Sequence, residues 1–194
     1  MKHNCYLNRA TIKGTTPQSS NKIMLTVIVS DFNTFTQTFY NSVISKVQLH
    51  RLKCSCGHSG CLYFHGYYSR SVITPSGKRS LYICRVKCSE CGHTHALLLS
   101  SMVPYSRIPL KVQRDIAVAC ENKSNQTGIC SSGIDENNVK SVVRRYVRFW
   151  RERLRSAGIS LESLTDLIFA CFSHYSKQMM QIRNTFNKLI ALST

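Results

Sequence analysis

Four cysteines in two closely spaced pairs are the residues of this sequence whose spacing points most directly to chemistry. One residue separates Cys54 from Cys56, and two residues separate Cys88 from Cys91. A glycine follows each pair and permits the tight turn that directs backbone N–H groups towards the sulfurs. Four thiolates brought together in this way suit a tetrahedral Zn²⁺ site with no open position. The pattern therefore predicts a structural zinc ion.

The one-residue gap in the first pair leaves the identity of the ligands open. Zinc knuckles usually have a gap of two or more residues, and Cys61 or His58 stands close enough to replace Cys54 or Cys56. The chain has ten cysteines, and the five outside the pairs other than Cys61 are expected to act as small hydrophobic side chains. This distribution favours a metal site in a reducing compartment over a set of disulfides.

His93 and His95 raise a second chemistry. A histidine pair with one residue between its members also occurs in endonucleases that cut single-stranded DNA with a tyrosine nucleophile. Those enzymes normally carry a bulky apolar residue between the histidines, whereas Thr94 stands there in this chain and a cysteine pair immediately precedes. A short motif of this kind is a weak signal, and we expect no catalytic role for it.

A β-hairpin is the element that must bring the two cysteine pairs together. Residues 62–68 and 71–73 are rich in aromatic and β-branched types, residues 74–77 have a turn sequence, and residues 81–86 resume the strand pattern. The two ends of an antiparallel hairpin lie side by side, so the cysteine pairs meet there. A third strand is expected at residues 94–99. A ribbon this small buries little apolar surface, so metal binding would contribute to its folding free energy.

The second half of the chain is predicted to be helical. Residues 135–155 repeat apolar side chains at three- and four-residue spacing and carry cations on another side, which predicts one continuous amphipathic helix. Asp135 is its expected N-cap, and Gly133 supplies the turn before it. Residues 110–119 and 124–130 are expected to form two helices upstream. Three helices with a glycine turn before a basic last one predict a helix-turn-helix.

The cationic side of this last helix predicts contact with DNA. The residues of its N-terminal half are expected to read base edges, and they are Asn137, Asn138, Lys140, Ser141 and Arg144. The later arginines are expected to contact phosphates, and they are Arg145, Arg148, Arg151 and Arg155. A second basic surface is expected on the ribbon, from Arg70, Lys78, Arg79, Arg85 and Lys87.

The charge of the whole chain supports a polyanionic partner. The chain has 26 Lys and Arg residues against 9 Asp and Glu residues, a formal net charge of +17. Double-stranded DNA is the expected partner. A membrane partner is not expected, because apolar stretches such as residues 23–29 are far shorter than the roughly 20 residues of a membrane span. Residues 1–20 have no apolar signal core, so we expect a cytoplasmic protein associated with the nucleoid.

These elements predict an α+β protein with a small antiparallel zinc ribbon, a helix-turn-helix region and C-terminal helices. In the N-terminal segment a strand is expected at residues 22–30 and a helix, capped by Asp31, at residues 31–46. The C-terminal helices are expected to complete the core or to form a homodimer, which would suit an inverted-repeat DNA site. The expected units are residues 1–46, 47–104, 105–158 and 159–194.

Several runs of residues resemble a known group of sequences. The runs are 65–70 (HGYYSR), 81–98 (LYICRVKCSECGHTHALL), 103–106 (VPYS) and 175–183 (YSKQMMQIR). They resemble an uncharacterised family of bacterial proteins, which is similar in turn to the N-terminal zinc-binding and helix-turn-helix region of insertion-sequence transposases. The resemblance extends over residues 50–190. It implies transposon-related DNA binding, as a regulator or as an accessory factor to a transposase.

An enzymatic function is not expected. Transposases of the acidic-triad type hold two metal ions with three carboxylates, whereas residues 156–194 contain only Glu162 and Asp166. Two binding functions stand as alternatives to DNA recognition. An RNA-binding zinc protein would stack single-stranded bases on exposed Tyr67, Tyr68 and Tyr82. An adaptor of a transposition complex would bind protein and show no salt-dependent affinity for nucleic acid.

Overall fold

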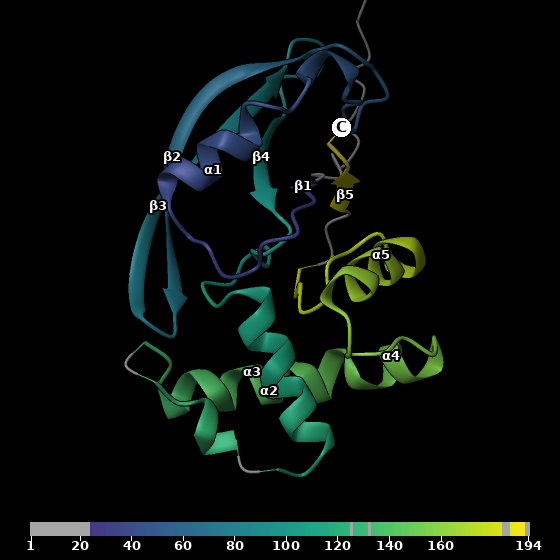
Figure 1. Ribbon diagram of the computed structural model, residues 1–194. Helices are drawn as coiled ribbons and strands as arrows, with labels where there is room; N and C mark the ends of the chain where they lie inside the picture. Colours follow the sequence, from purple (N-terminus) through teal and green to yellow (C-terminus); the bar gives the residue numbers. More distant parts are fainter. Residues whose placement is uncertain (1–23, 125, 132, 184–186, 193–194) are drawn as a thin grey trace, which may run out of the picture.

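The molecule consists of a five-stranded sheet and a group of helices. The computed structural model describes residues 24–124, 126–131, 133–183 and 187–192. The described chain is a mixed α+β protein, as the sequence predicts. Figure 1 shows the sheet with α1 against it, and the helices α2 to α4 gathered below. One apolar cluster lies between the sheet and α1, and a second lies among the helices. No helix within the described residues is long and apolar enough to cross a bilayer.

The predicted hairpin and third strand are confirmed. Strand β2 covers Leu62–Thr74, β3 covers Gly77–Cys88 and pairs with it antiparallel, and β4 covers Thr94–Leu99. A β-bulge interrupts the β2–β3 register between Phe64 and Gly66. The turn residue Gly77 has a φ of 113°, a conformation that other residues rarely adopt. The hairpin therefore runs from the cysteine pairs at one end to this turn at the other.

Two parallel strands from the ends of the chain enlarge the expected ribbon to the sheet order β2-β3-β4-β1-β5. Strand β1, Met24–Val27, confirms the strand expected at 22–30, of which residues 22 and 23 lie outside the described part. Strand β5, Asn187–Ile190, pairs with β1 where a helix was expected, so that prediction is wrong. Pairing with the open edge of β1 outweighs the helical spacing of the apolar residues.

Helix α1 covers Gln37–Ile44 and is shorter than the helix expected from residue 31. Its N-cap is Thr36. Asp31, the expected cap, instead accepts hydrogen bonds from the backbone N–H groups of residues 33 and 34 in a turn. The hydroxyl of Tyr40 accepts a hydrogen bond from the N–H of Cys84 and donates one to the carbonyl of Leu97, each 2.8 Å long. These residues form the next pair after the last β3–β4 pair in the register. The hydroxyl of Tyr40, a residue of α1, therefore bridges β3 and β4 at the position that follows their last backbone pair.

The helical part contains α2 (Leu110–Glu121), the 3-10 turn η2 (Gln126–Ile129), α3 (Glu136–Phe149), α4 (Arg151–Ser156) and α5 (Leu164–Tyr175). A further 3-10 turn, η1, covers Leu49–Arg51. Asp135 caps α3 as predicted, by accepting a hydrogen bond from the N–H of Asn138. The helix expected at 124–130 is only a 3-10 turn.

The continuous helix expected at residues 135–155 breaks at Trp150, where φ is −122°. The indole of Trp150 is fully buried, and its ring meets that of Tyr175 edge-on at 6.0 Å. The Tyr175 hydroxyl donates a hydrogen bond to the carbonyl of Arg153 in the first turns of α4. We attribute the interruption between α3 and α4 to packing of the indole against α5, although the N–H of Leu154 still donates to the carbonyl of Trp150.

Gly133 fixes the hairpin turn beside the start of α3. A Cβ atom at this residue would overlap the carbonyl oxygen of Thr74 and lie 2.8 Å from the nitrogen of Gly77. The two backbones are therefore in direct contact, which only glycine permits. Close to this contact, the N–H of Ile73 donates a hydrogen bond of 2.8 Å to the carbonyl of Arg107. The end of the hairpin is held by both segments that flank α2 and α3.

The variant Gly133→Ala is predicted to lower the free energy of unfolding by about 1–3 kcal/mol, because two backbone segments must separate to admit the methyl group. Chemical denaturation measures this loss. Gly128→Ala is the control, since its Cβ would have no heavy atom within 4 Å. Equal stability of Gly133→Ala and the unaltered chain would show that the hairpin turn does not pack against residue 133.

Candidate metal centre and nucleic-acid interface

The loops at the base of the hairpin bring four cysteine thiols together. The sulfurs of Cys54, Cys56, Cys61 and Cys88 all lie within 4.8 Å of one another, and such a group can hold a metal ion. Cys54 and Cys88 are buried, and Cys56 is exposed. The backbone N–H of Cys54 donates to the carbonyl of His58, and that of Ser89 donates to the carbonyl of Cys61. The loop before β2 is thereby tied to the end of β3.

Cys91 lies against the same cluster. Its sulfur is 3.6 Å from that of Cys54, and the sulfurs of Cys56 and Cys88 are 3.7 Å apart. With Zn–S bonds of about 2.3 Å, a tetrahedral Zn²⁺ site requires sulfur separations of about 3.8 Å. The structure thus brings all four predicted ligands together and adds Cys61, which the one-residue gap had indicated as an alternative. Five thiols are thus available for the four positions around one ion. Two ligand sets are possible: both contain Cys54, Cys56 and Cys88, and the fourth ligand is either Cys61 or Cys91.

Three histidines contact the sulfurs of this cluster. A ring nitrogen of His95 lies 3.3 Å from the sulfur of Cys54, one of His93 lies 3.2 Å from that of Cys91, and one of His58 lies 3.4 Å from that of Cys56. An imidazole N–H at this distance donates to a thiolate and disperses its charge. His95 is buried, so it is placed to support the thiolates and has no open face for a substrate.

The thiols of the cluster differ in how readily they lose a proton. Burial raises the pKa of Cys88, but hydrogen bonds from the backbone N–H of Cys91 and from the Cys61 thiol outweigh this and lower it to about 6. Burial raises the pKa of Cys61 to about 11 and that of Cys91 to about 12. Thiols this close together cannot all lose their protons unless a cation offsets the negative charges. A divalent metal ion supplies that charge, and its binding releases the protons.

The predicted DNA-contacting residues of α3 divide into two groups. One group lies on the solvent side of the helix with exposed side chains, and it consists of Asn137, Lys140, Ser141, Arg144 and Arg148. Asn138 is half-buried. Lys140 pairs with Glu136 one turn earlier at 2.7 Å, and the guanidinium of Arg148 lies 5.1 Å from the ring centre of Phe149. Arg144 forms no ion pair within the described part of the chain.

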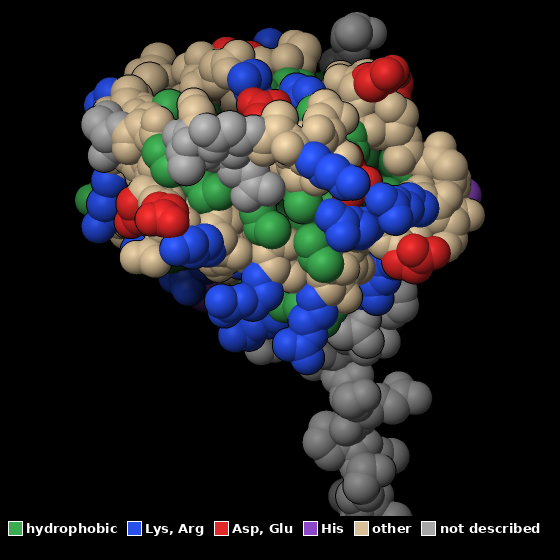
Figure 2. All heavy atoms as spheres, turned by 90° about the horizontal axis from the view of Figure 1, so that it is seen from below, with side chains coloured by type: hydrophobic (Ala, Val, Ile, Leu, Met, Phe, Trp, Pro, Cys, Tyr) green, Lys and Arg blue, Asp and Glu red, His purple; other side chains and the backbone are tan. Residues whose placement is uncertain are grey.

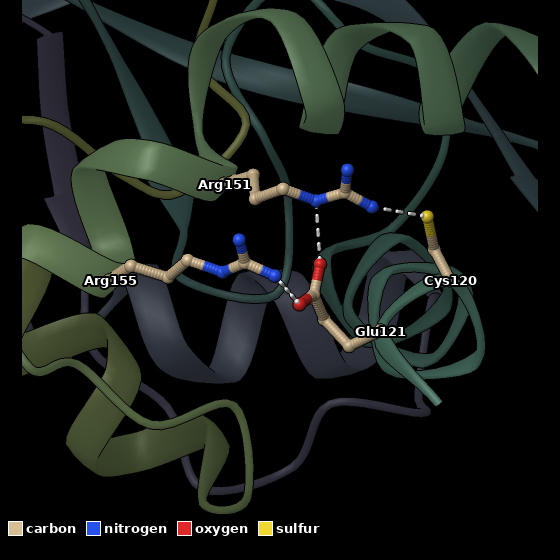
Figure 3. Close-up of polar contacts among 4 residues, drawn as sticks. All are labelled: Cys120, Glu121, Arg151 and Arg155. Atoms are coloured by element: carbon tan, nitrogen blue, oxygen red, sulfur yellow. Dashed lines mark hydrogen bonds and ion pairs between the residues drawn. The ribbon is translucent and has the colours of Figure 1, made fainter. Parts of the chain in front are cut away.

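The other group of arginines bonds to the protein itself. Arg145 is half-buried and donates to the side-chain oxygen of Gln113 on α2 at 3.2 Å. Figure 3 shows Arg151 and Arg155 reaching from α4 to Glu121 at the end of α2, with contacts of 2.7 and 2.6 Å to its two carboxylate oxygens. These three arginines hold the helices together.

Two of the five cations expected on the ribbon surface, Arg70 and Arg85, are also partly engaged. The guanidinium of Arg70 donates to the carbonyls of Val103 and Ser106, each at 2.7 Å, and so binds the segment that leads into α2. Arg85 is half-buried beside Gly66. Neither residue offers its whole side chain to a partner.

Glu121 is the residue of this region that sequence reasoning missed. Its place at the end of a predicted helix carried no sign that two later arginines would converge on it. Burial raises its pKa, but hydrogen bonds from Arg155 and Arg151 outweigh this, and the pKa lies below its ordinary value. The carboxylate is therefore ionised at neutral pH and attracts both cations.

Glu121→Gln is predicted to lower the free energy of unfolding at pH 7 by about 1 kcal/mol, because both ion pairs are partly exposed. A carboxyl group with a depressed folded pKa stabilises the fold above its unfolded pKa of about 4.3, and this contribution is lost as pH falls through the folded value. Denaturation at pH 7 and below pH 4 should therefore show a difference that vanishes in acid. Glu152→Gln, at an exposed site on α4, is the control, and identical behaviour of the two variants would contradict the ion-pair account.

Comparison with known proteins gives one match. Residues 53–145, slightly less than half of the chain, are similar to a family described as Domain of unknown function (DUF6431). No curated protein and no solved structure matches the chain. The matched segment contains both cysteine pairs, the whole hairpin, α2 and most of α3, so the similarity covers the candidate metal centre together with the exposed side of α3.

Proposed function

We propose that this chain is a zinc-dependent DNA-binding protein without a catalytic domain, in which α2, η2 and α3 act as a helix-turn-helix. The observation that carries the proposal is the solvent side of α3. It presents amides, a hydroxyl and cations along one face, while the apolar side, with Val139, Val142 and Tyr146, is buried against the core. The packing of α3 against the core therefore does not depend on its exposed amide, hydroxyl and cationic side chains.

The dimensions of α3 suit a groove of DNA. Its 14 residues extend over about 21 Å at 1.5 Å per residue, and the B-DNA major groove, about 12 Å wide, admits one helix. Asn137, Ser141 and Arg144 follow one another at three- and four-residue spacing, so they face the same side. Amide and guanidinium groups are the side chains that form paired hydrogen bonds with adenine and guanine edges.

The charge distribution supports a nucleic acid as the partner. Figure 2 shows the face below the helices, where Lys and Arg side chains gather in several groups around a small apolar area. Some of these cations neutralise internal carboxylates, but the chain has a net charge of +17 and only 9 acids to engage them. The remaining positive charge attracts phosphates and releases counterions when DNA binds.

Zinc is the metal that the donor set favours. Thiolates select soft or borderline metals over Mg²⁺ or Ca²⁺, and the sulfur separations of 3.6 and 3.7 Å suit tetrahedral Zn²⁺. Bound there, the ion would join the loop before β2 to the end of β3. Its role is structural, because the thiols present occupy every position of a four-coordinate ion.

The resemblance to the DNA-recognition region of insertion-sequence transposases favours a role in transposition, as a regulator of a transposon or as an accessory factor to a transposase. Glu162 and Asp166 lie outside the cysteine cluster. We assign recognition of DNA to the residues of this sequence, and strand cleavage to a partner transposase.

Binding of single-stranded RNA is the second candidate, and one observation favours it. Phe64, Tyr67 and Tyr82 are 52%, 53% and 62% exposed, and the rings of Phe64 and Tyr67 lie 5.1 Å apart. Exposed aromatic rings stack on unpaired bases. Tyr68 is half-buried and contributes less to such a surface. We rank this candidate second because the exposed side of α3 combines an amide, a hydroxyl and a guanidinium on Asn137, Ser141 and Arg144, which suit the base edges of duplex DNA.

The metal centre predicts one Zn²⁺ per chain in protein purified without added metal. Cys88→Ser should lose the ion, because Cys88 belongs to either possible ligand set. Of Cys61→Ser and Cys91→Ser, one should retain stoichiometric zinc, and elemental analysis thereby identifies the fourth ligand. Cys130→Ser, at an exposed cysteine outside the cluster, is the control. Zinc-free protein, or full zinc in Cys88→Ser, would contradict the proposed site.

The exposed side of α3 predicts a specific loss on Arg144→Ala. With a duplex selected from a random pool, affinity should fall by about 1–3 kcal/mol, and preference should relax at one base pair. Fluorescence anisotropy measures both effects. Arg51→Ala removes the same charge from the exposed η1 turn, outside the helical part, and should leave base preference intact. Unchanged affinity and preference for Arg144→Ala would remove α3 from the interface.

A further inference from the structure

The turn between β2 and β3 carries cations that the proposed function does not use. Lys78 and Arg79 follow the turn directly, and both side chains are exposed. Arg107, before α2, is exposed as well. None of the three forms an ion pair within the described residues. Unlike Arg151 and Arg155, these cations are available to a partner.

The position of the turn relative to α3 is fixed. The backbone of Gly133 packs against Thr74 and Gly77, and a second contact is the hydrogen bond from the N–H of Ile73 to the carbonyl of Arg107. The hydroxyl of Thr74, which is almost fully buried, donates to the carbonyl of Gly77 and closes the turn. The backbone that carries these cations is therefore held beside the start of α3.

Two hollows flank the turn. One, of 390 Å³, lies between the turn and α3, and its lining includes Lys78, Arg107, Asn137 and Asn138. The carboxylate of Asp135 also borders this hollow, but it is engaged in capping α3. The other, of 790 Å³, lies between the turn and the segment before α1, and it is lined by Lys78, Arg79 and uncharged residues that include Thr34, Thr36 and Gln37. Its lining contains no acidic residue.

This combination suits a phosphate backbone. Cations interspersed with hydroxyl and amide groups form the usual contacts to phosphate oxygens, which position a protein on DNA without reading its sequence. A helix in the major groove is bordered by phosphate strands on both sides. A basic turn held beside the first residues of the helix stands where one of these strands must pass.

We infer that the β2–β3 turn makes a second contact with the same DNA, in which Lys78 and Arg79 bind backbone phosphates next to the groove that α3 enters. The inference rests on the proposed function, because it requires α3 in the groove. It assigns the hairpin two roles: its base holds the metal, and its turn sets the position of α3 along the duplex. The turn contact is independent of sequence and widens the bound region on one side of the site.

The double variant K78A/R79A tests the inference with the full chain and a duplex selected from a random pool. Loss of two phosphate contacts should weaken binding and reduce the slope of log affinity against log salt by about 2, because each contact contributes about 0.9. Base preference should stay unchanged, and hydroxyl-radical protection should shorten on one side of the site. K46A/K188A removes the same charge from exposed residues away from the turn and is the control.

The outcomes separate this inference from the proposed function. If K78A/R79A keeps the salt slope and the protected region while Arg144→Ala still loses affinity, the turn does not contact DNA although α3 does. An equal slope change in K46A/K188A would also overturn the inference, since it would reflect net charge alone. If the unaltered chain shows no preference for duplex DNA, or prefers single-stranded RNA, both the proposed function and the inference fail.

Discussion

The pairing of β2 with β3 is the interaction on which the rest of the molecule depends. Its 12 register pairs join Leu62 to Cys88 at one end and Thr74 to Gly77 at the other. The first end gathers the thiols that no local sequence element could bring together alone. The second end meets Gly133 and places a basic turn beside α3. Without this pairing the cysteine cluster and the turn beside α3 would have no fixed position relative to each other. The entropy cost of closing the loop between the cysteine pairs would then oppose formation of the cluster.

The helices show that positive charge alone does not identify a binding residue. Arg145, Arg151 and Arg155 lie on α3 and α4 as the periodicity requires, but Gln113 and Glu121 on α2 bind them. In the DNA complex that we propose, their contribution would therefore be indirect, through the orientation of the helices. Arg144 and Lys78 form no ion pair within the described residues, so these cations remain available to a ligand. Internal satisfaction of a charge is thus the criterion that separates the two groups.

Local patterns predicted the elements that local interactions determine. The TPSG turn, the third strand and the N-cap at Asp135 depend on residues close together in the sequence, and all are confirmed. The errors arise from distant contacts. Asn187–Ile190 forms a strand because β1 has an open edge, and the helix breaks at Trp150 because Tyr175 packs against the indole. Likewise, the spacing of Cys54 and Cys56 indicated a fifth thiol, but only the folded loops place Cys61 among the sulfurs.

The central claim, that α3 and not another surface meets duplex DNA, is tested most directly by hydrogen exchange of the full chain with and without a duplex selected from a random pool. The account predicts slower backbone exchange in the first turns of α3 and in the β2–β3 turn, with unchanged exchange around Phe64 and Tyr82. Slower exchange around those aromatic residues with no change in α3 would contradict it, as would the absence of any change in the presence of saturating duplex.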